Sequence, residues 1–389
     1  MYNRAKMSRA CTLLAAVGVI AVSAGCAGLP LEASWPDVSL FGTPPQIMYV
    51  YADQARLIDP VDGSTSELRD SQGDVRLDDA GNPRTWAVQQ PASGAVTFYT
   101  RPIALDEDTL YLTAYENKLF EIDPVSSRIA NDSGVALPGH VVATPLLGAN
   151  LLYVPLSETN LVALDSETFD TSWTHSTERG VWATPLLHEG VLYVPSMDHI
   201  LYALDADTGE ERWRLDLEGA VASTPVIANN HLYVGSFGRK LFKIGLDGVI
   251  VASIATTEWI WGAPLVIDDE VYVADLGGWV YALLDQGDSF ETVWSRQVAT
   301  RGIRPTPLVT EDSVIVGSRD KFVYWVSRTT GDEQVKRELR GDVLSELLLL
   351  QPDQIGGIDE AYVVVSTLAR EELLVAFTLD DGERKWVYP

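Results

Sequence analysis

The chain has 389 residues, of which 46% are hydrophobic, so it is long enough for one large domain or for two or three ordinary ones and too apolar to be disordered. Its 55 acidic and 28 basic residues give a formal net charge of −27. This balance excludes non-specific binding to nucleic acid or anionic lipid, because both partners require a basic surface. The only cysteines are Cys11 and Cys26, so the rest of the chain has no disulfide, thiolate nucleophile or cysteine-bound metal.

Residues 1–25 have the organisation of a signal peptide. Three basic residues, Arg4, Lys6 and Arg9, precede an apolar run over 11–22 that is too short to be a comfortable membrane span. A secretory peptide of this kind predicts export of the chain.

The end of this segment, Ser23-Ala-Gly-Cys26, resembles the lipobox of bacterial lipoproteins, although Ser23 replaces the usual aliphatic residue. The resemblance implies that Cys26 is lipidated and that residues 26–36 form a tether. We therefore expect a lipid anchor in a bacterial membrane, either the outer membrane or, without one, the outer face of the cell membrane. The alternative is an ordinary secretory peptide with an incidental cysteine.

The remaining chain is an internal repeat. A proline recurs every 39 to 43 residues, at Pro102, Pro145, Pro185, Pro225, Pro264 and Pro307, and a copy without proline begins near Glu346. A second apolar segment occurs eight times, from Met48-Tyr49 to Ala361-Tyr362, and a third occurs eight times, from 56–59 to 375–378. A fourth segment is marked by tryptophan in five copies, at Trp86, Trp173, Trp213, Trp294 and Trp386.

Each unit therefore predicts four short strands separated by turns. In Asp205-Ala-Asp-Thr-Gly209 the aspartate can accept bonds from turn amides, and the glycine tolerates the positive φ of a tight hairpin. We expect the same turn-capping role for Asp123 and Asp165. The tryptophan that follows is expected to pack between neighbouring sheets.

Four-stranded units at this period predict an all-β fold: a single β-propeller over residues 37–389, with eight blades and seven as the alternative. The uncertain unit is the first, whose innermost strand we place at 38–41, before the turn at 42–45. The polar, acidic insertion at about 61–83 predicts an exposed loop or an extra hairpin.

The pattern Leu-Tyr-Ala-Leu-Asp-x-x-Thr-Gly-x-x-x-Trp at 201–213 resembles the PQQ-type, quinoprotein-like propeller repeat. A lipobox followed by one such propeller resembles BamB and its relatives, lipoproteins that assist the assembly of outer-membrane β-barrel proteins. The resemblance implies a non-catalytic scaffold, a monomeric propeller that binds an envelope protein of the barrel-assembly machinery. The quinoprotein dehydrogenases of the same repeat type are usually longer, and many use an adjacent cysteine pair that this chain lacks.

The sequence contains no recognisable catalytic or metal motif. The five histidines form neither His-x-His nor His-Glu-x-x-His, and there is no Gly-x-Ser-x-Gly elbow or phosphate-binding glycine loop. We expect no metal and no cofactor, with pyrroloquinoline quinone as the alternative.

The residues just before the innermost strands are expected to surround one mouth of the central channel. Where they differ between blades they do not serve the repeat itself, and Trp and Arg are frequent binding anchors. The candidates for a binding surface are Tyr99, His140, Trp182, Trp259, Trp261 and Arg304. The alternative is that the tryptophans pack between blades. Two other functions remain open: a redox propeller that binds a quinone or another small ligand, and an envelope propeller that binds polysaccharide.

Overall fold

The computed structural model describes residues 36–69, 74–78, 80–91, 94–98, 100–104, 109–130, 133–158 and 160–389. Over these ranges the regular structure is entirely β, with no α-helix, and hence no described helix could cross a bilayer. The signal peptide, Cys26, the tether up to residue 35 and Tyr99 lie outside the described residues. The expectations of export, lipidation and anchoring therefore stay predictions.

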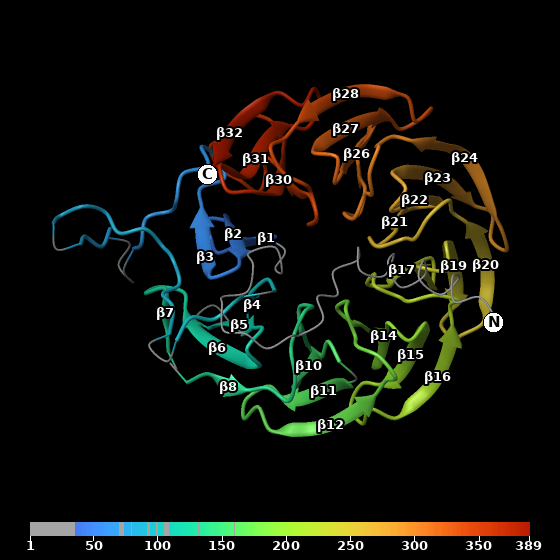
Figure 1. Ribbon diagram of the computed structural model, residues 1–389, viewed down its shortest axis with the longest axis horizontal. Helices are drawn as coiled ribbons and strands as arrows, with labels where there is room; N and C mark the ends of the chain where they lie inside the picture. Colours follow the sequence, from blue (N-terminus) through green and yellow to red (C-terminus); the bar gives the residue numbers. More distant parts are fainter. Residues whose placement is uncertain are drawn as a thin grey trace, which may run out of the picture.

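Eight antiparallel sheets are arranged as a ring around a central channel (Figure 1). Within each blade the chain starts at the innermost strand and works outward, as in the order β13-β14-β15-β16. The prediction of an all-β propeller is confirmed, with eight blades and not seven. Each repeat proline directly precedes an innermost strand; Pro185, for example, precedes β13. Proline has no backbone N–H, but a residue just before the strand does not donate to the neighbouring strand, so no hydrogen bond of the sheet is lost.

The strands are short throughout. Blades one and two contain β1 (Asp37–Phe41), β2 (Gln46–Tyr51), β3 (Gln54–Ile58), β4 (Ile103–Ala104), β5 (Leu110–Ala114), β6 (Lys118–Asp123), β7 (Arg128–Ile129) and β8 (Val135–Ala136). Blades three and four contain β9 (Leu146–Leu147), β10 (Leu151–Pro155), β11 (Asn160–Asp165), β12 (Thr171–Ser176), β13 (Leu186–His188), β14 (Val191–Pro195), β15 (Ile200–Asp205) and β16 (Glu211–Asp216).

The second half of the ring follows the same plan. Blades five and six contain β17 (Val226–Ala228), β18 (His231–Ser236), β19 (Lys240–Gly245), β20 (Ile250–Ala255), β21 (Leu265–Ile267), β22 (Glu270–Ala274), β23 (Trp279–Asp285) and β24 (Phe290–Gln297). Blades seven and eight contain β25 (Leu308–Val309), β26 (Ser313–Gly317), β27 (Phe322–Ser327), β28 (Glu333–Glu338), β29 (Leu348–Leu350), β30 (Tyr362–Ala369), β31 (Glu372–Thr378) and β32 (Arg384–Tyr388).

Blades one and two depart from four regular strands. In blade one, β1 pairs with β2 over its whole length, so the predicted innermost strand at 38–41 is confirmed. The fourth position of this blade is taken by the segment around Trp86, which contacts β3 through an isolated bridge between Arg56 and Ala87. In blade two the outermost strand is divided into β7 and β8, which both pair with β6.

The insertion at 61–83 is an arm that projects from the outer edge of blade one (Figure 1). Its described residues are joined by isolated antiparallel bridges, Glu67 with Thr85, Arg69 with Val75 and Leu77 with Pro83. At its base Leu68 is buried in the same hydrophobic cluster as Trp86. The expectation of an exposed loop or hairpin is therefore confirmed, and the arm is fixed to the blade by apolar packing.

Tryptophans hold neighbouring blades together around most of the ring. The indole N–H of Trp213 in blade four donates to the carbonyl of Leu246 in blade five at 2.9 Å. Five further contacts of this kind join Trp86 to Pro124, Trp173 to Ala206, Trp294 to Arg328, Trp325 to Leu379 and Trp386 to Pro60. The last of these joins blade eight to blade one, so the ring closes by packing and not by a shared strand.

The turn glycine is the surface on which each indole lies. Gly248 has a φ of +85°, and a Cβ added there would be 2.7 Å from the ring of Trp213. Gly209 and Gly331 have the same relation to Trp173 and Trp294. The glycine of the repeat therefore permits the turn and also the close approach of the neighbouring blade, while the aspartate caps the turn as predicted: Asp205 accepts bonds from the backbone N–H groups of Asp207 and Thr208.

The junction between blades five and six uses an ion pair instead. Ala252 occupies the register position that Trp213 has in blade four, opposite Lys243. The ammonium of Lys243 crosses to blade six, where it contacts the Asp285 carboxylate and the Gly287 carbonyl at 2.8 Å. Both side chains of the pair are almost fully buried. Blade seven shows another exchange, because its tryptophan, Trp325, lies in the third strand opposite Val335.

Gly248→Ala is expected to destabilise the protein more than Gly190→Ala. Both glycines have positive φ, but a Cβ at Gly190 meets nothing within 4 Å. Gly190→Ala then costs about 1–2 kcal/mol of backbone strain, and Gly248→Ala costs about 1–3 kcal/mol more because it displaces the indole. Chemical denaturation of the two variants measures the difference. Equal losses would show that the indole contact contributes little.

Candidate functional site at the channel mouth

The connections between blades place one side chain per blade at the mouth of the channel. In five connections a buried aliphatic residue donates its backbone N–H to the preceding blade: Val181 to Leu156, Val221 to Ser196, Ile260 to Ser236, Ile303 to Asp275 and Val343 to Ser318. The residue that follows each of them lines the central cavity, and these residues are Trp182, Ala222, Trp261, Arg304 and Leu344. Val142, which follows the buried Val141, lines the cavity as well. Because these five connections are anchored, their side chains are presented from a rigid frame.

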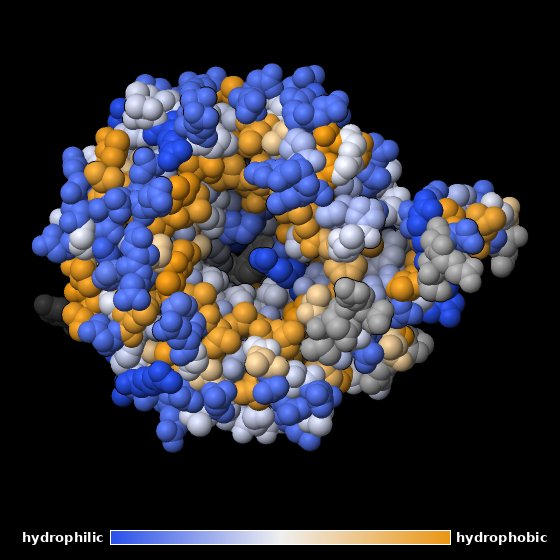
Figure 2. Space-filling model, turned by 180° about the vertical axis from the view of Figure 1, so that it is seen from behind, coloured by the Kyte–Doolittle hydropathy of each residue, from blue (hydrophilic) through white to orange (hydrophobic). Residues whose placement is uncertain are grey.

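The cavity has a volume of about 200 Å³ and is lined by residues of all eight blades. Its wall has two unlike halves. Blades three to six contribute the apolar and aromatic residues Val142, Trp182, Ala222 and Trp261, whereas blades seven, eight, one and two contribute Arg304, Glu346, Asp37 and Arg101. Figure 2 shows the hollow at the centre of one face of the ring, with hydrophobic side chains around the opening and strongly hydrophilic ones within it.

The aromatic half is continued by a cluster that reaches onto the adjoining loops. Arg304 lies over the ring of Trp261, with its guanidinium carbon 4.1 Å from the ring centroid. Phe237, at the tip of the loop between β18 and β19, has its centroid 5.5 Å from that of Trp261. Phe237 also stacks on Trp259, with ring centroids 4.9 Å apart and an interplanar angle of 11°. The indole N–H of Trp182 donates to the carbonyl of Ser157 in the preceding blade.

The charged half contains two carboxyl groups and two arginines, Arg101 and Arg304. Arg101 pairs with Asp37 at 3.5 Å and also donates its backbone N–H to the same oxygen. Glu346 accepts hydrogen bonds from the backbone N–H of Thr306 at 2.7 Å and from its hydroxyl at 3.2 Å. Desolvation within the ring raises the pKa of both Asp37 and Glu346, and Arg101 counteracts this only in part. The charge of Asp37 also raises the pKa of Glu346.

Arg304 is the buried cation of the mouth, with 8% of its surface exposed. Burial, and secondarily the nearby charge of Arg319, lower its pKa to about 10, and Asp342 opposes the shift. Arg304 is therefore still positively charged at neutral pH. Its contact with the face of Trp261 supplies part of the compensation that a buried guanidinium requires.

The structure brings together four of the six residues selected from the sequence. Trp182, Trp261 and Arg304 line the cavity, and Trp259 adjoins them through Phe237. His140 does not line the cavity; it stacks on Tyr115 at 4.5 Å, and its Nδ1 lies 2.6 Å from the Tyr115 carbonyl oxygen. Tyr99 lies outside the described residues. Their use as a binding surface stays a prediction.

Sequence analysis missed Phe237 and, in the charged half of the wall, Asp37, Arg101 and Glu346. Glu346 begins the copy without proline, and Arg101 directly precedes the first repeat proline. Both stand one residue before the position of the repeat proline, whereas the comparison used the position three residues before it, which holds Tyr99 and Leu344 in these two copies. Comparing the residue just before the proline as well would have found both. Phe237 belongs to a different loop, so no matched position connects it to Trp261.

Other polar clusters have structural explanations. Asp123 and Asp165 cap their turns by accepting backbone N–H bonds. Among the described residues no group of three or more His, Cys, Asp or Glu side chains is placed to hold a metal ion.

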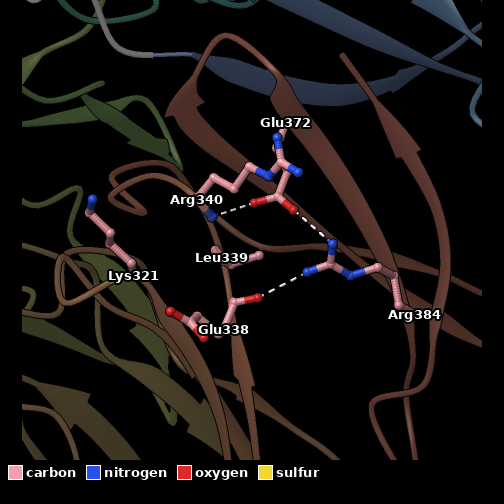
Figure 3. Close-up of a pocket in the computed structure, with 6 residues that line it drawn as sticks. All are labelled: Lys321, Glu338, Leu339, Arg340, Glu372 and Arg384. Carbon is pink, nitrogen blue, oxygen red and sulfur yellow. Dashed lines mark hydrogen bonds and ion pairs between the residues drawn. The ribbon is translucent and has the colours of Figure 1, made fainter.

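A second cavity, of about 450 Å³, lies between blades seven and eight (Figure 3). There the buried carboxylate of Glu372 accepts bonds from the Arg340 backbone N–H and the Arg384 side chain. Arg384 also donates to the Glu338 carbonyl oxygen and thereby ties the two blades together.

The comparisons with known proteins agree with this architecture. The sequence model of a family described as outer membrane protein assembly factor BamB matches residues 173–251 and 198–302. The crystal structure of BamB from Moraxella catarrhalis has a TM-score of 0.63 and 17% identity, covering 85% of this chain and 91% of that one. The computationally designed protein Ika8 has a TM-score of 0.61 and 14% identity, covering 92% and 96%. No curated protein sequence matches the chain.

The chain is thus a β-propeller, and over residues 173–302 its repeats are similar to those of the PQQ-type family described as BamB. At these identities the solved structures show the fold alone.

Glu346→Gln is expected to stabilise the protein at neutral pH. An acid whose pKa is raised by folding ionises at lower pH in the unfolded chain, so stability falls as pH rises through the interval between the two pKa values. The interval begins near the ordinary glutamate pKa of 4.5 and extends upward. The amide removes this loss and keeps an oxygen for the Thr306 N–H.

Thermal unfolding from pH 3 to pH 8 tests this. The gain from Glu346→Gln should vanish at the acidic end, where the glutamate is protonated in both states. The exposed control Glu311→Gln, in the same part of the ring, should show no such dependence. A gain that persists at pH 3 would contradict the explanation.

Proposed function

We propose that this protein is an exported, lipid-anchored scaffold that binds another envelope protein and acts as BamB does in the assembly of outer-membrane β-barrel proteins. Support comes from the family model, which is described by that role, and from the lipobox-like end of the signal peptide. The observation that carries the proposal is the channel mouth, where aromatic rings and a buried arginine are presented together from anchored connections.

The mouth has the composition of a protein-binding surface. Trp, Tyr and Arg dominate the energetics of protein interfaces because they combine a large contact area with directed polar groups. Here Trp182 and Trp261 are half-buried, and Arg304 is held against Trp261 before any partner arrives. Side chains that are ordered in advance lose little entropy on binding.

The charge of the wall gives no support to a quinone enzyme. Asp37 and Glu346 face the cavity together with Arg101 and Arg304, so the formal charges of the wall balance. The wall therefore has no cationic excess that would select the three carboxylates of pyrroloquinoline quinone, and the proposal includes no redox step.

Site-specific photo-crosslinking in native membranes tests the proposal. A photoreactive phenylalanine analogue at Phe237 is expected to capture an outer-membrane barrel-assembly protein, because the ring lies beside Trp261 at the mouth. The matched control is the same analogue at Val125, in a turn at the opposite end of the strands and 37% exposed. Capture of the same protein from both positions, or of a dehydrogenase or a transporter, would contradict the proposal. Retention of the protein on glycan arrays would favour polysaccharide binding instead.

Trp182→Ala is expected to reduce this capture about tenfold or more, as expected for loss of an interface anchor, with a thermal midpoint near that of the unmodified protein. Its ring borders the cavity and is only half-buried. The comparison variant is Trp213→Ala, whose indole lies between two blades. This variant should have a clearly lower thermal midpoint, because it loses a contact between blades. A large loss of stability in Trp182→Ala would assign that residue to packing.

A further inference from the structure

The outer edge of blade five differs from those of the other blades. Its outermost strand β20, Ile250–Ala255, has the sequence Ile-Val-Ala-Ser-Ile-Ala and contains no charged or strongly polar residue. Outermost strands β16, β24, β28 and β32 all carry charged residues, and β12 is polar. Charges on edge strands prevent pairing with other chains, so β20 lacks a protection that its neighbours have.

Blade four supplies a residue-by-residue comparison. The registers place Ser253 opposite Phe242 as they place Arg214 opposite Tyr202. On this alignment the exposed residues Glu211 and Asp216 of β16 correspond to Ile250 and Ala255 of β20. The strands have nearly the same burial pattern, and only the chemistry of the edge differs.

Apolar side chains are exposed around this edge. Val249 and Ile250 have 58% and 41% of their surface exposed. On the neighbouring blade, Val293 in β24 is 55% exposed, and β24 contacts β20. Among the described residues only seven large hydrophobic side chains are exposed to this degree, and three of them lie on these two strands or directly beside them.

The backbone of β20 has groups that point away from its own sheet. The strand is the last in the order β17-β18-β19-β20. The N–H of Thr256 donates to Arg239, and hydrogen-bonded pairs alternate in an antiparallel ladder. Ser253 and Ala255 therefore direct their N–H and C=O groups outward, where another strand could pair with them.

We propose that β20 is a docking edge at which an extended segment of a partner protein adds as a fifth strand of blade five. The segment alternates apolar with polar residues, because β20 offers exposed apolar side chains. It is uncharged or basic, because β20 itself has no charge and the protein as a whole is acidic. A second copy of this chain is disfavoured as the occupant, since two bodies of net charge −27 repel each other. The edge is distinct from the channel mouth, and the proposal does not depend on the function assigned to that mouth.

Fluorescence anisotropy with a synthetic strand tests the proposal. The probe is a labelled, capped peptide that alternates valine and threonine and has a lysine at each end. Ser253→Pro removes one outward N–H and therefore one backbone hydrogen bond to the peptide. It is expected to weaken binding about tenfold, which corresponds to about 1.4 kcal/mol. Arg214→Pro is the matched control, at the equivalent position of blade four, and should bind the peptide as the unmodified protein does.

Three further measurements make the outcome decisive. The same peptide with alternate amides N-methylated should not bind, because it cannot pair along its backbone. Ile250→Glu combined with Ser253→Arg, which copies the charges of blade four, should also abolish binding without a proline in the strand. Sedimentation should show a monomer. Equal binding of the methylated peptide, no effect of either variant, no binding by the unmodified protein, or a dimer that Ser253→Pro dissociates would each overturn the proposal.

Discussion

The contact between an indole ring and a turn glycine is the interaction on which the ring depends. A blade buries its apolar residues only against its neighbours, so a propeller is stable only if every junction is closed. At most junctions a tryptophan lies on the glycine of the next blade's turn and donates to a nearby carbonyl. One glycine thus satisfies the φ of its own turn and the space requirement of its neighbour, which links local conformation to packing between blades.

The junction between blades five and six lacks this contact. It shows that the space between neighbouring blades must be filled, but that the residue need not be tryptophan. Between blades five and six a lysine takes the place of the indole and brings its own carboxylate partner, Asp285. A buried ion pair contributes less reliably than an apolar ring, because desolvation opposes the attraction. Between blades eight and one the usual contact recurs at Trp386, so this ring needs neither a disulfide nor a shared strand to close.

A symmetric frame also explains how the chain creates an asymmetric site. In the anchored connections the buried aliphatic residue packs within the ring, and the residue that follows it is not needed for this packing and can differ between blades. These variable positions include Trp182, Trp261 and Arg304, and together with Asp37, Arg101 and Glu346 they form an aromatic half and a charged half around one cavity. The outermost strands vary in the same way: the frame sets their burial pattern, but the identity of the exposed side chains decides whether an edge is protected, as in β16, or open, as in β20.

The sequence by itself determined the repeat, the propeller, the turn-capping aspartates, the tryptophans between blades and even the weak first strand at 38–41. Each of these follows from local patterns, in which spacing and residue type recur along the chain. It also selected Trp182, Trp261 and Arg304, because their positions match between copies. Only the tertiary structure placed Phe237 against Trp261, set Asp37 and Arg101 beside Glu346, and separated His140 from the cavity. Those relations join loops from different blades, and their distances arise from closing the ring, which no local pattern records.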